Sequence, residues 1–277
     1  MKKTVVGTIR VAIIASAFVG SALSAQTVTP TTPNGWAFGD GSSGANPAAI
    51  TGTQPFNGNG SLQFSVPANT TNTQPLAYYL FGAPVALSGL NSLSLGYSFL
   101  TPLGTPVATS VTIRLLLTNL TGTGRTDRSD GSFGWYLNGT SNTWQTQNLG
   151  LASGDFFFRI GGVGQASTDC QNTASSFDDR RTTISAFRTA CNGGIGTKAN
   201  LSTAIIYGVE VDFGTFNSPS ANTAFADQVK FSVGTNNGDY NFETAAPTVT
   251  PEPASVALVA FGMLAVGVVA RKRNRNS

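Results

Sequence analysis

The sequence predicts an all-β protein whose body is an antiparallel β-sandwich of jelly-roll type, with an N-terminal signal peptide and a C-terminal single transmembrane helix. Two observations predict the sandwich: apolar and polar residues alternate in several short runs, and turn-rich stretches rather than long helical patterns separate these runs. Strands of this kind bury one face, so two sheets of them stack against each other. With 40% hydrophobic and 10% charged residues among 277, the chain has the composition of a folded protein.

Residues 1–25 have the parts of a secretory signal peptide. Lys2, Lys3 and Arg10 precede an apolar run that is too short to cross a bilayer, and small residues at 21–25 suit cleavage. A buried first helix of the fold is the alternative, but the stretch rich in Gln, Thr and Pro at 26–33 would stop such a helix. We therefore expect export.

Residues 26–246 form one predicted domain, in which six stretches show the period of two that half-buried strands have. Gly, Asn, Pro and Ser gather at 58–60, 102–106, 193–194 and 236–238, where we expect turns, and only residues 176–189 suit a short helix. The apolar residues of the six stretches are Leu62, Phe64 and Val66; Leu93, Leu95, Tyr97 and Phe99; Val111, Ile113, Leu115 and Leu117; Phe156, Phe158 and Ile160; Tyr207, Val209, Val211 and Phe213; and Val229, Phe231 and Val233.

The chain has two cysteines, Cys170 and Cys191. In an exported protein, such a pair is expected to form a disulfide, which would stabilise the fold by roughly 3 kcal/mol on the loop-entropy model. A catalytic thiol is the alternative. It is disfavoured because the chain has no His, which also removes Ser-His-Asp triads and His-dependent metal centres.

Glu210 and Asp212 are candidates for acid chemistry because they are two apart on a predicted strand and project from one face, roughly 6 to 7 Å apart. The pair resembles the start of the Glu-x-Asp-x-x-Glu strand of jelly-roll glycosidases. Thr215 and Phe216 stand where the second Glu is needed, so hydrolysis has no mechanism. We expect the two acids to lie on a solvated outer face.

Two further acid pairs, Asp127 with Asp130 and Asp178 with Asp179, could supply oxygen ligands to a structural calcium ion. Neither follows the Asp-x-Asp-x-Asp-Gly spacing of a calcium loop, and pairing with Arg or loop capping is the favoured alternative. We therefore expect no metal site and no cofactor, with structural calcium as the alternative. Asp227, at the entry of its strand, is expected to make a strand-end hydrogen bond.

Three aromatic residues, Trp135, Tyr136 and Trp144, fall close together around an Asn-Gly turn. Flat rings can stack on sugar faces, so these rings are a candidate glycan platform. The alternative is that Trp135 or Tyr136, together with Trp144, fills the core as large rings usually do.

The last 31 residues carry the most specific signal. A linker and Pro-Glu-Pro box at 247–253 precedes an uncharged apolar run of 17 residues, 254–270, which is just long enough to span a bilayer. The tail 271–277 is basic and is expected to stay cytoplasmic, leaving the body on the other side of the membrane. Its cationic residues are Arg271, Lys272, Arg273 and Arg275.

This arrangement resembles the PEP-CTERM sorting signal of Gram-negative bacteria, with Pro251, Glu252 and Pro253 as the box and Thr250 where that family often has Val. The resemblance implies recognition by an exosortase, a membrane-embedded Cys-type transpeptidase, and a setting in bacteria that make exopolysaccharide and biofilm. A plain tail anchor is the alternative. The body is similar only in general pattern to galactose-binding-like and carbohydrate-binding β-sandwich modules, which transfers no residue.

The charge of the body argues against nucleic-acid binding. The sequence pI of about 9.0 comes from the two ends, since residues 26–246 have nine Lys and Arg against twelve Asp and Glu. No cluster of basic residues is available for phosphates.

The leading hypothesis is a non-catalytic protein with a structural or adhesive role in an exopolysaccharide or biofilm layer. It would pass through a transient inner-membrane anchor to the cell surface or extracellular matrix. A carbohydrate-binding module that contacts extracellular polysaccharide is the second hypothesis, and a glycoside-active enzyme is the least favoured.

Overall fold

The computed structural model describes residues 25–40, 47–102, 110–120, 131–137, 141–160, 181–191, 200–213, 215–218 and 220–245. The signal peptide apart from Ala25, the Pro-Glu-Pro box, the transmembrane run and the basic tail lie outside these residues. Within the described ranges, no helix has the length and apolar character needed to cross a membrane.

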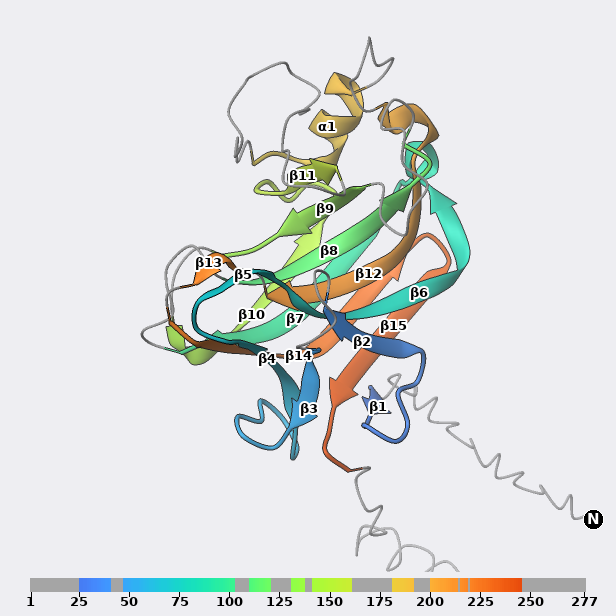
Figure 1. Cartoon of the computed structure of the whole chain (residues 1–277). Coiled ribbons are helices and arrows are strands. Elements are labelled where there is room, and N and C mark those ends of the chain that lie inside the picture. The colour runs from blue at the N-terminus through green and yellow to red at the C-terminus, as the bar shows by residue number, and fades with distance from the viewer. Residues whose placement is uncertain are drawn as a thin grey trace, which may run out of the picture.

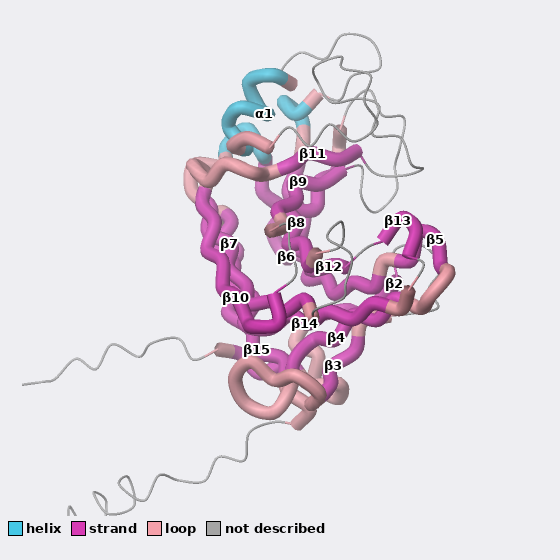
Figure 2. The backbone as a smooth tube through the Cα atoms, turned by 90° about the vertical axis from the view of Figure 1, so that its left-hand side faces the viewer, coloured by secondary structure: helices cyan, strands magenta, loops and turns pink. Residues whose placement is uncertain are grey.

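The body is a sandwich of two mainly antiparallel sheets (Figures 1 and 2), so the predicted sandwich is confirmed. The seven strands of sheet A are β1 (Gln26–Val28), β3 (Ala49–Thr51), β4 (Ser61–Val66), β7 (Leu93–Thr101), β10 (Ser141–Gly150), β14 (Asn222–Val233) and β15 (Asn236–Phe242). β14 is central: β7 pairs with one side of it, while β4 and then β15 pair with the other. β10 pairs with β7, and β1 runs parallel to β15.

Sheet B is antiparallel throughout, in the order β11-β9-β8-β12-β6-β2. Its strands are β2 (Trp36–Asp40), β6 (Pro75–Ala86), β8 (Val111–Thr118), β9 (Gly131–Trp135), β11 (Phe157–Ile160) and β12 (Ile205–Phe213). A small third sheet pairs β5 (Thr70–Thr73) with β13 (Thr215–Ser218). The short helical turns are η1 (Leu87–Gly89), α1 (Ile184–Ala190) and η2 (Leu201–Thr203).

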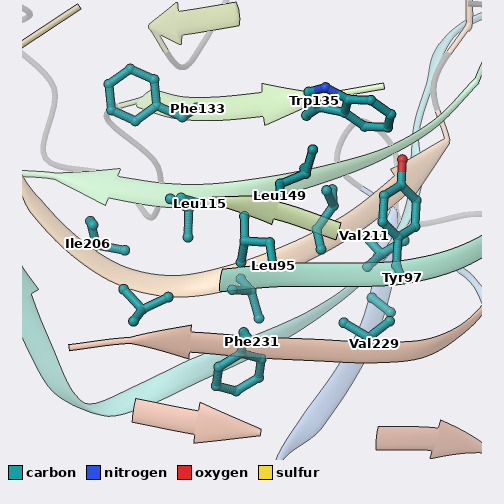
Figure 3. Close-up of a cluster of buried hydrophobic side chains, with 14 of the residues drawn as sticks. Leu95, Tyr97, Leu115, Phe133, Trp135, Leu149, Ile206, Val211, Val229 and Phe231 are labelled. Atoms are coloured by element: carbon teal, nitrogen blue, oxygen red, sulfur yellow. The ribbon is translucent and has the colours of Figure 1, made fainter. Parts of the chain in front are cut away.

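The core lies between the two sheets and is built from the alternating residues that predicted the strands (Figure 3). Leu95, Tyr97 and Phe231 face it from sheet A, and Leu115 and Phe133 face it from sheet B. The Tyr97 hydroxyl donates a hydrogen bond of 3.0 Å to the Val111 carbonyl oxygen, which links β7 to β8 across the sandwich. Each fully buried apolar side chain contributes about 1.5–3 kcal/mol relative to an exposed one.

All six alternating stretches contribute to strands, although Phe156 forms an isolated bridge to Thr182 just before β11. The short helix expected within 176–189 is present as α1, where the Thr183 hydroxyl accepts the Ala186 N–H at 3.1 Å as an N-cap. α1 lies beside β11, at the opposite end of the sandwich from β3 (Figures 1 and 2).

The prediction of a turn at 236–238 was wrong, because these residues begin β15. The chain turns instead at Gly234 and Thr235, where Gly234 has a φ of +60°, in the left-handed region that glycine adopts at low cost. Asn236 supports this turn by donating from its amide to the Ala83 carbonyl oxygen at 2.7 Å.

Candidate functional site

Glu210 and Asp212 lie on the central strand β12, on the face opposite the core residues Val209 and Val211. The prediction that they lie on a solvated face was wrong, because Glu210 is 7% exposed and Asp212 is 0% exposed. The alternation of the strand assigns a side chain to a face, but it does not show what covers that face. Here Arg114, from the neighbouring strand β8, lies directly opposite Glu210.

Arg114 holds both acids. Its Nε donates to Asp212 Oδ2 at 2.6 Å and lies 3.6 Å from Glu210 Oε1, while its Nη1 donates to the Ser132 hydroxyl at 3.3 Å. The side-chain amide of Gln74 also donates to Asp212 Oδ2. Burial lowers the pKa of Arg114, but the charges of Asp212 and Glu210 outweigh this effect and raise that pKa above its ordinary value. Arg114 therefore remains charged and fastens β8 to β12.

The guanidinium of Arg114 also lies over the ring of Phe157, 5.3 Å from its centroid. Phe157 packs closely on β9, because a Cβ added at Gly134 would lie only 2.2 Å from its ring. The ring of Phe157 thus lies against the guanidinium of this ion network, and the two carboxylates of the network share one cation.

The three candidate aromatic residues have different settings. Trp135 is 6% exposed and packs edge-on against Tyr97 in the core, with ring centroids 6.3 Å apart. Its position fits the core-filling alternative. Tyr136 is partly exposed and lies under the guanidinium of Arg181, 4.1 Å from the centroid of the Tyr136 ring.

Trp144 lies in β10 of sheet A and forms a ring pair with Phe56, with centroids 5.1 Å apart and planes tilted by 54°. Phe56 belongs to the loop 52–60, which joins β3 to β4, and is 36% exposed. Sequence reasoning missed Phe56, because a single aromatic residue in a Gly- and Ser-rich loop has no periodic signal. Only its contact with a strand 88 positions later in the chain reveals it.

Asp227 lies within β14 rather than at its entry, and its carboxylate is fully buried. The expected hydrogen bonds to the backbone are present, since Oδ1 accepts the N–H of Gln228 at 2.8 Å and of Phe242 at 3.0 Å. Burial raises the pKa of Asp227 to about 7, and the nearby backbone N–H groups of Phe242, Gln228 and Asn57 act in the opposite direction.

The remaining sequence candidates fall largely outside the described residues. Cys191 is buried at the C-cap of α1 and is not a free thiol, whereas Cys170 is not described, so the disulfide stays a prediction. The four acids proposed as alternative calcium ligands, Asp127, Asp130, Asp178 and Asp179, are not described either. No group of three or more acidic or Cys side chains suited to a metal ion occurs in the described part of the chain.

Residues 249–273 match the PEP-CTERM protein-sorting motif. The sequence-based identification of this sorting signal is therefore confirmed, and the motif implies export, cell-surface sorting and processing by an exosortase. No curated protein sequence matches the chain.

The body is similar in structure, at low identity, to carbohydrate-binding β-sandwich modules. One is a family 11 carbohydrate-binding module from Clostridium thermocellum, with 11% identity, a TM-score of 0.35 and coverage of 71% of this chain and 88% of the module. Another is the carbohydrate-binding module CBM4, with 14% identity, a TM-score of 0.31 and coverage of 73% of this chain and 97% of the module. An arabinose-bound α-L-arabinofuranosidase has 14% identity, a TM-score of 0.39 and coverage of 76% of this chain and 25% of the enzyme.

Proposed function

We propose that this chain, which carries a PEP-CTERM sorting motif, has a non-catalytic structural or adhesive role in an exopolysaccharide or biofilm layer. The motif at 249–273 is the observation that carries the proposal, because it implies delivery to the cell surface by an exosortase. The proposal includes a jelly-roll connectivity for the sandwich and removal of residues 1–25 on export.

The tail suits a transient anchor. Residues 254–270 would hold the chain in the inner membrane while the basic residues 271–275 remain cytoplasmic, and the Pro-Glu-Pro box would be read by the exosortase. Cleavage would then free the body for the cell surface or matrix.

A non-catalytic role is supported by the state of Glu210 and Asp212, the pair with the spacing closest to that of a glycosidase. A glycosidase needs one carboxyl group that gives up a proton and a second that attacks or activates water. Here Arg114 binds both carboxylates, and the pair is buried. This arrangement favours a structural role for the two acids, as part of an ion network that stabilises sheet B.

The sorting part of the proposal is tested by Glu252→Ala in a host that has an exosortase. The helix is unchanged, so membrane association should remain while the sorting cut is lost, and Thr250→Val outside the box is the matched control. Mass spectrometry of mature protein should find a C-terminus lacking 271–277 in wild type and control only. The same mature C-terminus in Glu252→Ala would leave the tail as a plain anchor and refute sorting.

Carbohydrate binding is a second candidate function, and the ring pair of Phe56 and Trp144 favours it. Both rings are at least partly exposed. The strand that carries Trp144, β10, has no charged residue and is rich in Asn, Gln, Ser and Thr. Rings stack on the apolar C–H faces of sugars, while amides and hydroxyls suit sugar hydroxyl groups. The surface therefore has the chemistry that a neutral polysaccharide requires.

Binding of the purified protein to a glycan array, followed by Trp144→Ala and Phe56→Ala, tests this candidate. Each substitution should weaken binding by about tenfold or more, because central aromatic contacts are commonly worth more than about 1 kcal/mol. Leu80→Ala is the matched control, since Leu80 is 46% exposed on sheet B. Binding that survives both ring substitutions would exclude this surface.

A further inference from the structure

Three short helical elements, η1, α1 and η2, are joined by main-chain hydrogen bonds. The Leu87 N–H, at the start of η1, donates at 2.9 Å to the carbonyl oxygen of Ala204, the C-cap of η2. The Leu201 N–H of η2 donates at 3.0 Å to the carbonyl oxygen of Cys191, the C-cap of α1. The three elements therefore form one unit at the end of the sandwich that carries α1, away from β3 (Figure 1).

A cavity of about 360 Å³ lies between these elements, a volume within the range of about 300–1,000 Å³ that small-molecule sites have. Leu201, which is 2% exposed, gives the cavity one apolar wall. Its other lining residues are polar, and they are Ser88, Ser185, Arg188, Thr189 and Ser202. We call this cavity the Arg188 pocket.

Arg188 is the charged residue that lines the pocket in the described part of the chain. Its Nη1 donates to the Leu90 carbonyl oxygen at 3.1 Å, and its Nη2 donates to the Ser88 carbonyl oxygen at 2.6 Å. These neutral acceptors hold the guanidinium in place but leave its charge unbalanced, and no acid among the described residues pairs with it. A guanidinium carries more N–H donors than these two bonds use. Arg188 is therefore a fixed cation that can still donate to a ligand.

Hydroxyl groups surround this cation. The Thr189 hydroxyl donates to the Ser185 carbonyl oxygen at 3.1 Å, whereas the hydroxyls of Ser88, Ser185 and Ser202 bond to no other described residue. A serine hydroxyl can donate to a ligand and accept from it. The described lining includes no aromatic ring, so the pocket offers charge and hydrogen bonds rather than stacking.

We propose that the Arg188 pocket binds the carboxylate of a uronic acid residue in an acidic polysaccharide. A planar carboxylate accepts two parallel hydrogen bonds from a guanidinium, and its single negative charge is matched by one cation. The serine hydroxyls suit the sugar hydroxyl groups beside that carboxylate. This inference rests on the proposed role in an exopolysaccharide layer and names a class of polysaccharide for it. The pocket is separate from the ring pair of Phe56 and Trp144 on sheet A.

Titration calorimetry of the full chain, purified in detergent, tests the pocket with tetragalacturonate and with its fully methyl-esterified form. The two probes have the same sugar rings but differ in charge. Tetragalacturonate should bind, and the methyl ester should bind at least about tenfold more weakly, because charge-assisted hydrogen bonds to carboxylates are the stronger ones. Added sodium chloride should weaken binding, because Arg188 is partly exposed and its charge is screened by salt.

Ser185→Asp is the most informative variant. Ser185 is exposed and lies three residues before Arg188 on α1, so the new carboxylate would compete for the guanidinium without changing the core. It should weaken tetragalacturonate binding by about tenfold or more, whereas the uncharged Ser185→Asn should stay within about threefold of the wild type. Arg188→Gln should also lose binding, and Lys230→Gln, which removes a cation on sheet A, should keep it. Thermal melting establishes that each variant is folded.

The failure of this inference differs from the failure of the proposed function. The pocket assignment is overturned if tetragalacturonate does not bind the wild type, if its binding survives Ser185→Asp, or if the methyl ester binds equally well. Inorganic phosphate that binds as tightly as tetragalacturonate would show a general anion site and would overturn the assignment too. The proposed function is refuted instead by sorted protein that washes freely from the extracellular polysaccharide of its host.

Discussion

Replacing Arg114 with Met should be among the most destabilising single changes on sheet B. The substitution keeps much of the side-chain volume but leaves Asp212, which is 0% exposed, and Glu210, which is 7% exposed, without their cation. Removing one partner of a buried ion pair typically costs about 3–5 kcal/mol. For a domain of this size, that corresponds to a fall in Tm of roughly 6–20 °C.

Equilibrium unfolding in urea, together with thermal melting, would measure this effect. Lys230→Met is the matched control, because Lys230 and Asp239 form a pair whose side chains are 51% and 29% exposed, and exposed pairs contribute about 0–1 kcal/mol. The triple variant Arg114→Met, Glu210→Gln, Asp212→Asn should recover much of the loss, because it removes the buried charges as well. An Arg114→Met variant that is no less stable than Lys230→Met would contradict the reasoning.

Three further predictions concern other parts of the chain. If Cys170 and Cys191 are bridged, alkylation without reductant should label neither cysteine, and labelled thiols in the exported protein would refute the bridge. In a urea titration, the double Ser variant should lose at most about 3 kcal/mol of unfolding free energy. Leu264→Asp, near the centre of the apolar run 254–270, should cost about 2.5–3.5 kcal/mol of insertion free energy. Cell fractionation should therefore find the body secreted unsorted, and an unchanged membrane fraction would count against a marginal span. Gly134→Ala should lower the Tm, because the new methyl group would lie 2.2 Å from the ring of Phe157; an unchanged Tm would show that the ring can move aside.

The sequence predicted the strands well wherever the period of two was unbroken. Leu95, Tyr97 and Phe99 face the core from β7, as their alternation required. The same rule worked less well for β14, because a bulge interrupts it. Ala224 and Ala226 face the core before the bulge and Val229 and Phe231 after it, and Gln228, with a φ of +48°, takes up the extra residue. The sequence therefore predicted only the second half of this strand.

The candidate sites depended on contacts between distant segments, which a period cannot reveal. Arg114 and Asp212 are 98 positions apart, and Arg188 and Ser88 are 100 apart, yet each pair is in direct contact. Alternation placed Asp212 and Arg114 each on the face of its strand opposite the core, but it did not show that β8 and β12 are neighbours. The ring pair of Phe56 and Trp144 was missed for the same reason.

The position of β14 at the centre of sheet A has a consequence for the order of folding. Its partners β4 and β7 lie far upstream in the chain, and β15, which follows it, ends at Phe242, seven residues before the sorting motif begins at 249. In a chain that crosses a membrane with its N-terminus first, the early strands emerge without the strand that joins them. Sheet A can then close only when almost all of the body has crossed, since its long-range pairings form last and slowly. The tail would still be in the membrane at that moment. The body would therefore complete its fold shortly before the chain is released from the membrane.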